Sequence, residues 1–217
     1  NVSLIYFLSQ KFFKNKTLHI IATLVFAVFS TIPSLEGEIS NGEIFMIMPA
    51  TAAILAILDN KPRFFWVGFL FSISFLFKIP IVFDFFAVFF WFFFINQAPK
   101  KIFSTSTLVL ISAFFAPILI SLGYYSLKGA GYTYLRSALM QNIGYLGSWA
   151  GDNTGLFIRA GILTLIFAVI YLFRNSLGKK LCLLLLWSTA ALFGALLSGR
   201  PYPHYLLQII PPFSLLL

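Results

Sequence analysis

Three short polar stretches interrupt an otherwise apolar chain, and they hold the side chains whose chemistry could serve a reaction. They supply a carboxylate, an ammonium, a guanidinium and an imidazole. Groups of these types at one interface can bind a phosphate and handle a proton. The candidate residues in the three stretches are Asn41, Glu43, Lys78, Arg200, Tyr202 and His204.

Each charged candidate also has an ordinary structural explanation. Glu43 could solvate the start of a helix, where an acid suits the helix dipole, and Lys78 could reach the lipid headgroups. Arg200 could hold a lipid phosphate without specificity, and His204 could be a hydrogen-bonded histidine at the interface. Asp84 follows Lys78 within the same apolar run and could be its ion-pair partner.

The composition indicates which elements must position these side chains. The chain is 60% hydrophobic and 10% charged, whereas a soluble domain carries about 25% charged residues. Apolar runs long enough to span a membrane, at about 20 residues each, follow one another along the chain. We therefore expect an all-α, polytopic transmembrane helical bundle. It would form one domain over residues 1–217, with about eight to nine spans. Both ends lie in apolar runs, so we expect a fragment truncated at both ends.

The longest apolar run extends from Phe64 to Ile95 and contains Lys78. As one helix its 32 residues would measure about 48 Å, although the hydrocarbon core is only about 30 Å thick. Lys78 would also lie near the bilayer centre, where a charge is costly. Two shorter spans that meet at Lys78 and Pro80 avoid both problems, and Pro80 suits a first turn better than a helix interior.

The net charge of +9 comes from basic residues in the turns between spans, which is the positive-inside pattern rather than a nucleic-acid-binding face. Ten of the fifteen Lys and Arg residues fall on one side, which we assign to the cytoplasm. They are Lys11, Lys14, Lys16, Lys61, Arg63, Lys100, Lys101, Arg174, Lys179 and Lys180. The six candidate site residues fall on the opposite side.

Cysteine and histidine are too scarce for several classes of site. Cys182 is the single cysteine, so no disulfide framework or cysteine-based metal site is possible within the chain. His19 and His204 are the only histidines, which excludes a histidine-rich metal site.

Between the spans, the stretch from Tyr132 to Met140 is expected to form a helix on the membrane surface.

Four segments resemble parts of the GT-C class of integral-membrane glycosyltransferases. The resemblance is to the dolichyl-phosphate-mannose-protein mannosyltransferase-like family and its bacterial branch of lipid-linked sugar transferases. The segments are similar to an Asn-x-Glu helix start, a Gly-rich span with a lysine turn, an outer-face segment and a late turn. In chain order they are SNGEIFMIMPATAAILAI (Ser40–Ile57), GFLFSISFLFKIPIVFDFFAVFFWFF (Gly68–Phe93), QNIGYLGSW (Gln141–Trp149) and SGRPYPHYLLQIIPP (Ser198–Pro212).

The resemblance implies an inverting glycosyltransferase of the inner membrane. Such an enzyme takes a sugar from a polyprenyl-phosphate carrier at the outer face and passes it to a lipid, glycan or protein acceptor. The resemblance also implies that Lys78 and Arg200 hold the carrier phosphate. Glu43 and His204 would position the acceptor, a divalent metal or both. The family's principal catalytic acid lies in the first outer loop, which we expect before Asn1.

Two other hypotheses remain open at this stage. The chain could belong to a transporter or flippase for lipid-linked sugars, which should show inverted repeats and broken helices near the midplane. Alternatively, it could be a non-catalytic membrane subunit, in which case Glu43, Lys78, Arg200 and His204 would lie far apart. Asn41 and Tyr202 complete the expected substrate-binding set.

Overall fold

The computed structural model describes residues 1–96, 104–141, 154–198, 200 and 202–216, and within these ranges the regular elements are helices. The α-helices are α1 (Val2–Phe12), α2 (Lys16–Phe29), α3 (Gly42–Ile57), α4 (Phe64–Phe77), α5 (Val82–Phe90), α6 (Thr105–Leu127), α7 (Gly131–Leu135), α9 (Thr154–Leu172), α10 (Arg174–Leu177), α11 (Lys179–Ala195) and α12 (Ile210–Phe213). Shorter 3-10 or π segments are η1 (Pro33–Leu35), η2 (Ile79–Ile81), η3 (Trp91–Asn96), η5 (Arg136–Met140) and η6 (Pro203–Ile209).

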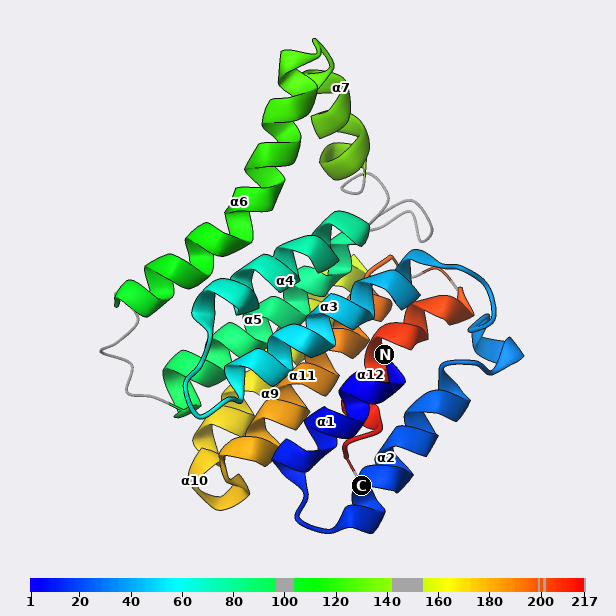
Figure 1. The fold of residues 1–217 in the computed structure, drawn as a ribbon, viewed down its shortest axis with the longest axis vertical. Helices are drawn as coiled ribbons and strands as arrows, with labels where there is room; N and C mark the ends of the chain where they lie inside the picture. Colours follow the sequence, from blue (N-terminus) through cyan, green and yellow to red (C-terminus); the bar gives the residue numbers. More distant parts are fainter. Residues whose placement is uncertain (97–103, 142–153, 199, 201, 217) are drawn as a thin grey trace.

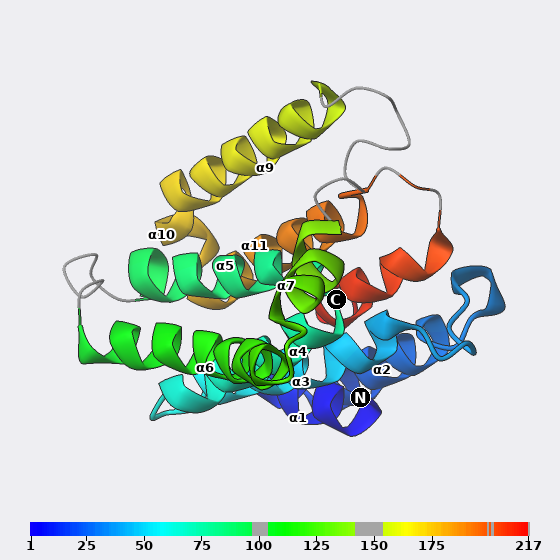
Figure 2. The same ribbon diagram turned by 90° about the horizontal axis from the view of Figure 1, so that it is seen from above.

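The helices pack in layers that Figures 1 and 2 show from two directions. One layer runs through α6, α4, α3, α1 and α2, in which each helix packs against the next. A second layer contains α5, α11 and η6, and α9 lies outside it against α11. Helices α3, α4 and α11 contribute side chains to the buried apolar core.

Three helical segments are long and apolar enough to cross a membrane: Ile79–Asn96, Thr105–Leu127 and Gly155–Leu172. Helices α3 and α4 are shorter, with 16 and 14 residues, or about 24 and 21 Å of helix. The exposed side of α9 is apolar, and the exposed fractions of Phe157, Leu165 and Leu172 are 73%, 63% and 70%. A surface of this kind is suited to lipid rather than water. The chain therefore has the features of an all-helical membrane protein.

Polar contacts join two pairs of turns that the basic residues assigned to one side of the membrane. The Lys11 ammonium lies 2.9 Å from an Asp59 carboxylate oxygen, and Lys179 donates to the carbonyl oxygen of Asn96 at 2.9 Å. Both contacts join turns that the charge distribution assigned to the cytoplasmic side. The structure therefore groups these turns as the sequence predicted.

The chain breaks at Lys78, as its position in the long apolar run predicted. Helix α4 ends at Phe77, and Lys78 has extended backbone angles of φ −160° and ψ 127°. Pro80 then lies in the first turn of η2, where its missing N–H leaves no helical hydrogen bond unmade. The chain reverses direction here, so that α5 runs back beneath α4 (Figure 1).

Two other predicted segments have different outcomes. The stretch from Tyr132 to Met140 is helical, in α7 and η5, as expected. The last apolar run, from Tyr205 to Leu217, was expected to begin a final span, but residues 203–213 form the 3-10 segment η6 and one α-helical turn instead. Pro211 and Pro212 are adjacent and have no backbone N–H, so two successive helical hydrogen bonds to the preceding turn are lost, which disfavours a regular α-helix there. Most of the outer-face segment Gln141–Trp149 lies outside the described residues.

Gly68 allows α4 and α6 to approach closely, which leads to a testable prediction. A Cβ at Gly68 would lie 2.2 Å from the carbonyl oxygen of Leu110 and 2.9 Å from the backbone nitrogen of Phe114. Because these are backbone atoms of the facing helix, Gly68→Ala should push the helices apart. We expect it to lower the free energy of unfolding by about 2 kcal/mol, measured by denaturation with SDS in mixed micelles.

Gly161 on α9 provides the matched control for that substitution. No heavy atom from another part of the described chain lies within 4 Å of a Cβ built at Gly161. Gly161→Ala should therefore change stability only through helix propensity, with a gain of up to about 1 kcal/mol. If the two alanine variants lost equal stability, close helix packing at Gly68 would be excluded as the cause.

Candidate functional site

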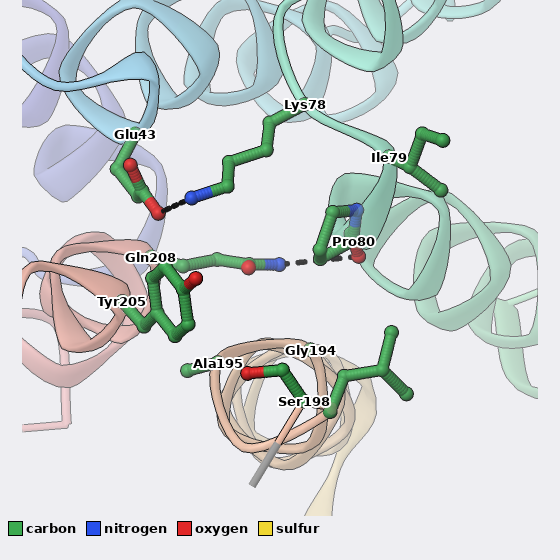
Figure 3. A pocket seen from close by; sticks show the side chains of 10 residues that line it. Glu43, Lys78, Ile79, Pro80, Gly194, Ala195, Ser198, Tyr205 and Gln208 are labelled. Atoms are coloured by element: carbon green, nitrogen blue, oxygen red, sulfur yellow. Dashed lines mark hydrogen bonds and ion pairs between the residues drawn. The ribbon is translucent and has the colours of Figure 1, made fainter. Parts of the chain in front are cut away.

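The strongest candidate site is a small cavity where the starts and ends of four elements meet (Figure 3). The N-terminal turn of α3, the turn between α4 and η2, the end of α11 and the middle of η6 surround it. The cavity has a volume of about 70 Å³, which is enough for several water molecules. Its lining residues are Glu43, Lys78, Ile79, Pro80, Gly194, Ala195, Leu197, Ser198, Tyr205 and Gln208.

Glu43 and Lys78 form an ion pair at this cavity. The Lys78 ammonium donates to Oε1 of Glu43, whose residue is only 2% exposed. The ammonium also lies 4.1 Å from the centroid of the Tyr205 ring, which places it in a cation–π arrangement. Both charges therefore belong to the site, because each is held by a partner from a different element (Figure 3).

Asp84 is not the partner of Lys78, contrary to the alternative that their spacing suggested. The Asp84 carboxylate accepts hydrogen bonds from Nε1 of Trp187 at 2.9 Å and from Nε2 of Gln208 at 2.8 Å. Lys78 lies beyond the end of α4 and has extended backbone angles. Lys78 and Asp84 are therefore not on one continuous helix, and the helical spacing that suggested their pairing does not apply. The lysine turns instead toward α3.

Gln208 connects this buried carboxylate to the cavity. Its amide Nε2 donates to Asp84 and lies 3.4 Å from the carbonyl oxygen of Pro80, while the side chain also lines the cavity. Gly194 makes room for it, since a Cβ there would lie 2.9 Å from the Gln208 Nε2 and 3.1 Å from the Pro80 oxygen. The network fixes one wall of the site.

His204 lies beside the cavity in a second carboxylate pair. Its Nδ1 contacts Oε2 of Glu36, a residue whose left-handed φ of 53° turns the chain after η1. The imidazole stacks on Tyr202 with 5.6 Å between ring centroids, and it meets the Tyr205 ring edge-on at 4.8 Å. Tyr205 therefore separates this pair from the Lys78 ammonium and contacts both.

Arg200 and Asn41 lie next to the cavity rather than in its lining. The backbone N–H of Arg200 donates to the hydroxyl of Ser198 at 3.3 Å, and Ser198 lines the cavity. The Asn41 amide donates to the backbone oxygen of Glu36 at 3.2 Å. Asn41 occupies the N-cap position of α3 without a side-chain capping hydrogen bond, and its amide ties the Glu36 turn to the helix that carries Glu43.

No protein family, curated protein or solved structure matches this chain. The geometry of the site therefore carries the functional argument. Within the described ranges, no group of three His, Cys, Asp or Glu side chains is placed to share a metal ion. The site that the structure does define is an ion-paired ammonium in a small cavity with aromatic and amide walls.

Sequence reasoning missed three of the residues that build the cavity: Gly194, Tyr205 and Gln208. Gln208 is the one side-chain amide in the apolar stretch between Tyr205 and Leu217, and this isolated polar residue could have marked it. Gly194 and Tyr205 carry no comparable signal, because glycine and tyrosine are common in apolar spans and at their ends. Their roles depend on the packing of α11 against η6.

Proposed function

We propose that this chain is part of a membrane glycosyltransferase that takes a sugar from a polyprenyl-phosphate carrier. The observation that carries the proposal is the Lys78 ammonium, held by Glu43 and Tyr205 in a cavity at one end of the bundle. A lysine with only part of its side chain exposed is a suitable contact for a phosphate that gains charge as it leaves. The resemblance of the Lys78 and Arg200 segments to the GT-C class adds support.

An apolar groove beside Lys78 suits the carrier lipid. Lys78 and Ile79 line a second depression next to the cavity, and this depression shares Phe75 and Leu139 with a groove between α5 and α6 whose lining is entirely apolar. A carrier with its phosphate at Lys78 would be able to lay its isoprenoid chain along this groove. The polar and apolar parts of such a donor thus have separate, adjoining surfaces.

The proposed reaction is a direct displacement at the anomeric carbon of the sugar. An acceptor hydroxyl oxygen bonds to that carbon while the carbon–oxygen bond to the carrier phosphate breaks and its electron pair stays on the phosphate. Lys78 stabilises the leaving phosphate, and Arg200, whose backbone N–H bonds to the cavity-lining Ser198, is proposed to assist it. The hydroxyl proton passes to a base, and the His204 imidazole oriented by Glu36 has the arrangement for this role. We place the reaction at the outer face of the inner membrane.

A transfer assay tests the proposal. The protein that contains this chain is reconstituted with polyprenyl phosphate carrying tritium-labelled mannose or glucose, together with a membrane lipid extract as acceptor source. The expected result is labelled sugar on an acceptor and free polyprenyl phosphate in equal amounts. Donor that is bound or moved across the bilayer with its sugar still attached would instead favour a transporter and contradict the transferase.

A pair of variants links any transfer to the cavity. Ser198→Phe places a ring in the cavity that Ser198 lines and should lower the transfer rate by about tenfold or more, because it displaces the reacting groups. Leu196→Phe introduces the same ring at an exposed position on the same turn and should leave the rate within about twofold. Equal rates in the two variants would place the reaction elsewhere.

A further inference from the structure

A second charged cluster lies at the opposite end of α3 from Glu43. It consists of Lys11 at the end of α1, Asp59 just after α3 and Arg63 just before α4. The Asp59 carboxylate lies 2.9 Å from the Lys11 ammonium and 3.4 Å from Nε of Arg63. The hydrogen bond from Lys11 lowers the pKa of Asp59 below its ordinary value, so the carboxylate is ionised at neutral pH.

The cluster lies at one end of a groove on the lateral surface of the helical bundle. Helices α1, α3 and α4 lie side by side, with α3 in the middle (Figures 1 and 2), and the groove between them has a volume of about 540 Å³. Ala52 and Ala56 of α3 line its centre, while Phe7 of α1 and Trp66 of α4 line its sides. Small residues between large ones leave room for an elongated apolar group.

The surroundings of the groove are strongly positive. The two turns at this end of the groove, residues 11–16 and 59–63, contain five lysine and arginine side chains and one carboxylate, for a net charge of +4. Lys14, Lys16 and Lys61 are exposed, and the Arg63 side chain is 65% exposed. Trp66 follows Arg63 by one helical turn, at the depth where aromatic residues mark the membrane interface.

We propose that this groove binds an anionic phospholipid, with the headgroup phosphate at Arg63 and Lys11 and an acyl chain between Phe7 and Trp66. Charge complementarity selects the ligand, because Asp59 neutralises only one of the surrounding cations. Basic pockets between transmembrane helices recognise anionic headgroups by this mechanism. The site lies at the other end of α3 from Glu43, so it is independent of the proposed transferase function.

Quenching of Trp66 fluorescence tests this site directly. The protein is reconstituted in phosphatidylcholine vesicles with a small, equal fraction of either phosphatidylglycerol or phosphatidylcholine brominated on the acyl chains. The difference between wild type and Trp66→Phe isolates the Trp66 signal from that of the other tryptophans. We expect the association constant for brominated phosphatidylglycerol to exceed that for brominated phosphatidylcholine by about fivefold or more.

Charge variants separate a selective site from ordinary contact with lipid. Arg63→Gln should reduce the preference by about fivefold, whereas Asp59→Asn should increase it because the one opposing charge is removed. Lys180→Gln removes an exposed cation from another turn predicted on the same side and should leave the preference unchanged. If Arg63→Gln lowers the preference for phosphatidylglycerol and Asp59→Asn raises it, misfolding cannot explain both results.

Two outcomes would overturn the proposal. Equal quenching by the two brominated lipids would mean that the groove meets bulk lipid without selecting a headgroup. No quenching of Trp66 by either lipid would mean that another protein segment covers the groove. In either case the transfer assay at Lys78 would be unaffected, so failure here is distinguishable from failure of the proposed function.

Discussion

Replacing Lys78 with methionine is expected to lower the free energy of unfolding by about 3–5 kcal/mol. Glu43 is 2% exposed, and the Lys78 ammonium is its ion-pair partner across the cavity. Without that partner, a buried carboxylate faces an apolar environment at large cost. Unfolding in mixed micelles of SDS and a mild detergent, followed by circular dichroism, gives the free energy.

A double-mutant cycle shows whether the loss comes from the unpaired charge. Glu43→Gln removes the carboxylate, so the variant that carries both Glu43→Gln and Lys78→Met should recover most of the stability lost by Lys78→Met alone. Lys180→Met changes an exposed lysine and should stay within about 0.5 kcal/mol of the wild type. Strictly additive losses in the double variant would mean that the two side chains do not interact.

Removing the carboxylate of Asp84 is expected to cost about 3 kcal/mol of stability in Asp84→Ala. Asp84 is 1% exposed and accepts from Trp187 Nε1 and Gln208 Nε2. The alanine variant leaves two buried donors without this acceptor. Asp84→Asn retains one side-chain oxygen, so it should lose about half as much. The same detergent unfolding measures both, and the fluorescence spectrum of Trp187 reports the lost hydrogen bond.

Asp59 provides the matched comparison for Asp84. It also has two side-chain partners, a hydrogen bond from Lys11 and an ion pair with Arg63. These lie at the surface of the bundle, where an ion pair contributes at most about 1 kcal/mol. Asp59→Ala should therefore be much milder than Asp84→Ala. Similar losses at the two sites would indicate that burial does not strengthen the Asp84 network.

Several features of the fold were predictable because they depend on local sequence. The low charge and long apolar runs predicted helices with lipid-compatible surfaces, as the exposed side of α9 shows. The charge of Lys78 and the missing N–H of Pro80 predicted a break within the run that starts at Phe64. Pro211 and Pro212 likewise lack a backbone N–H and disfavour a regular helix in the last apolar run. The prediction of a span there did not take these prolines into account.

The candidate site was predictable only in part. Glu43, Lys78 and His204 stood out as polar residues at the ends of apolar runs, and the structure brings Glu43 and Lys78 into contact while His204 lies on the far side of Tyr205. Asp84 was the acid that the sequence suggested as a possible partner of Lys78, and the pairing of Lys78 with Glu43 was not predicted. The pairing of His204 with Glu36 was not predicted.

The sequence by itself determined the helical, lipid-compatible character of this chain and its break at Lys78, because hydropathy, charge and proline content act through each residue and its near neighbours. Only the tertiary structure decided which side chains meet. Glu43 reaches Lys78, and Gln208 reaches Asp84, because α3, α5 and η6 present particular faces to one another. Those faces are set by close packing, as at Gly194, where one added carbon would meet Gln208.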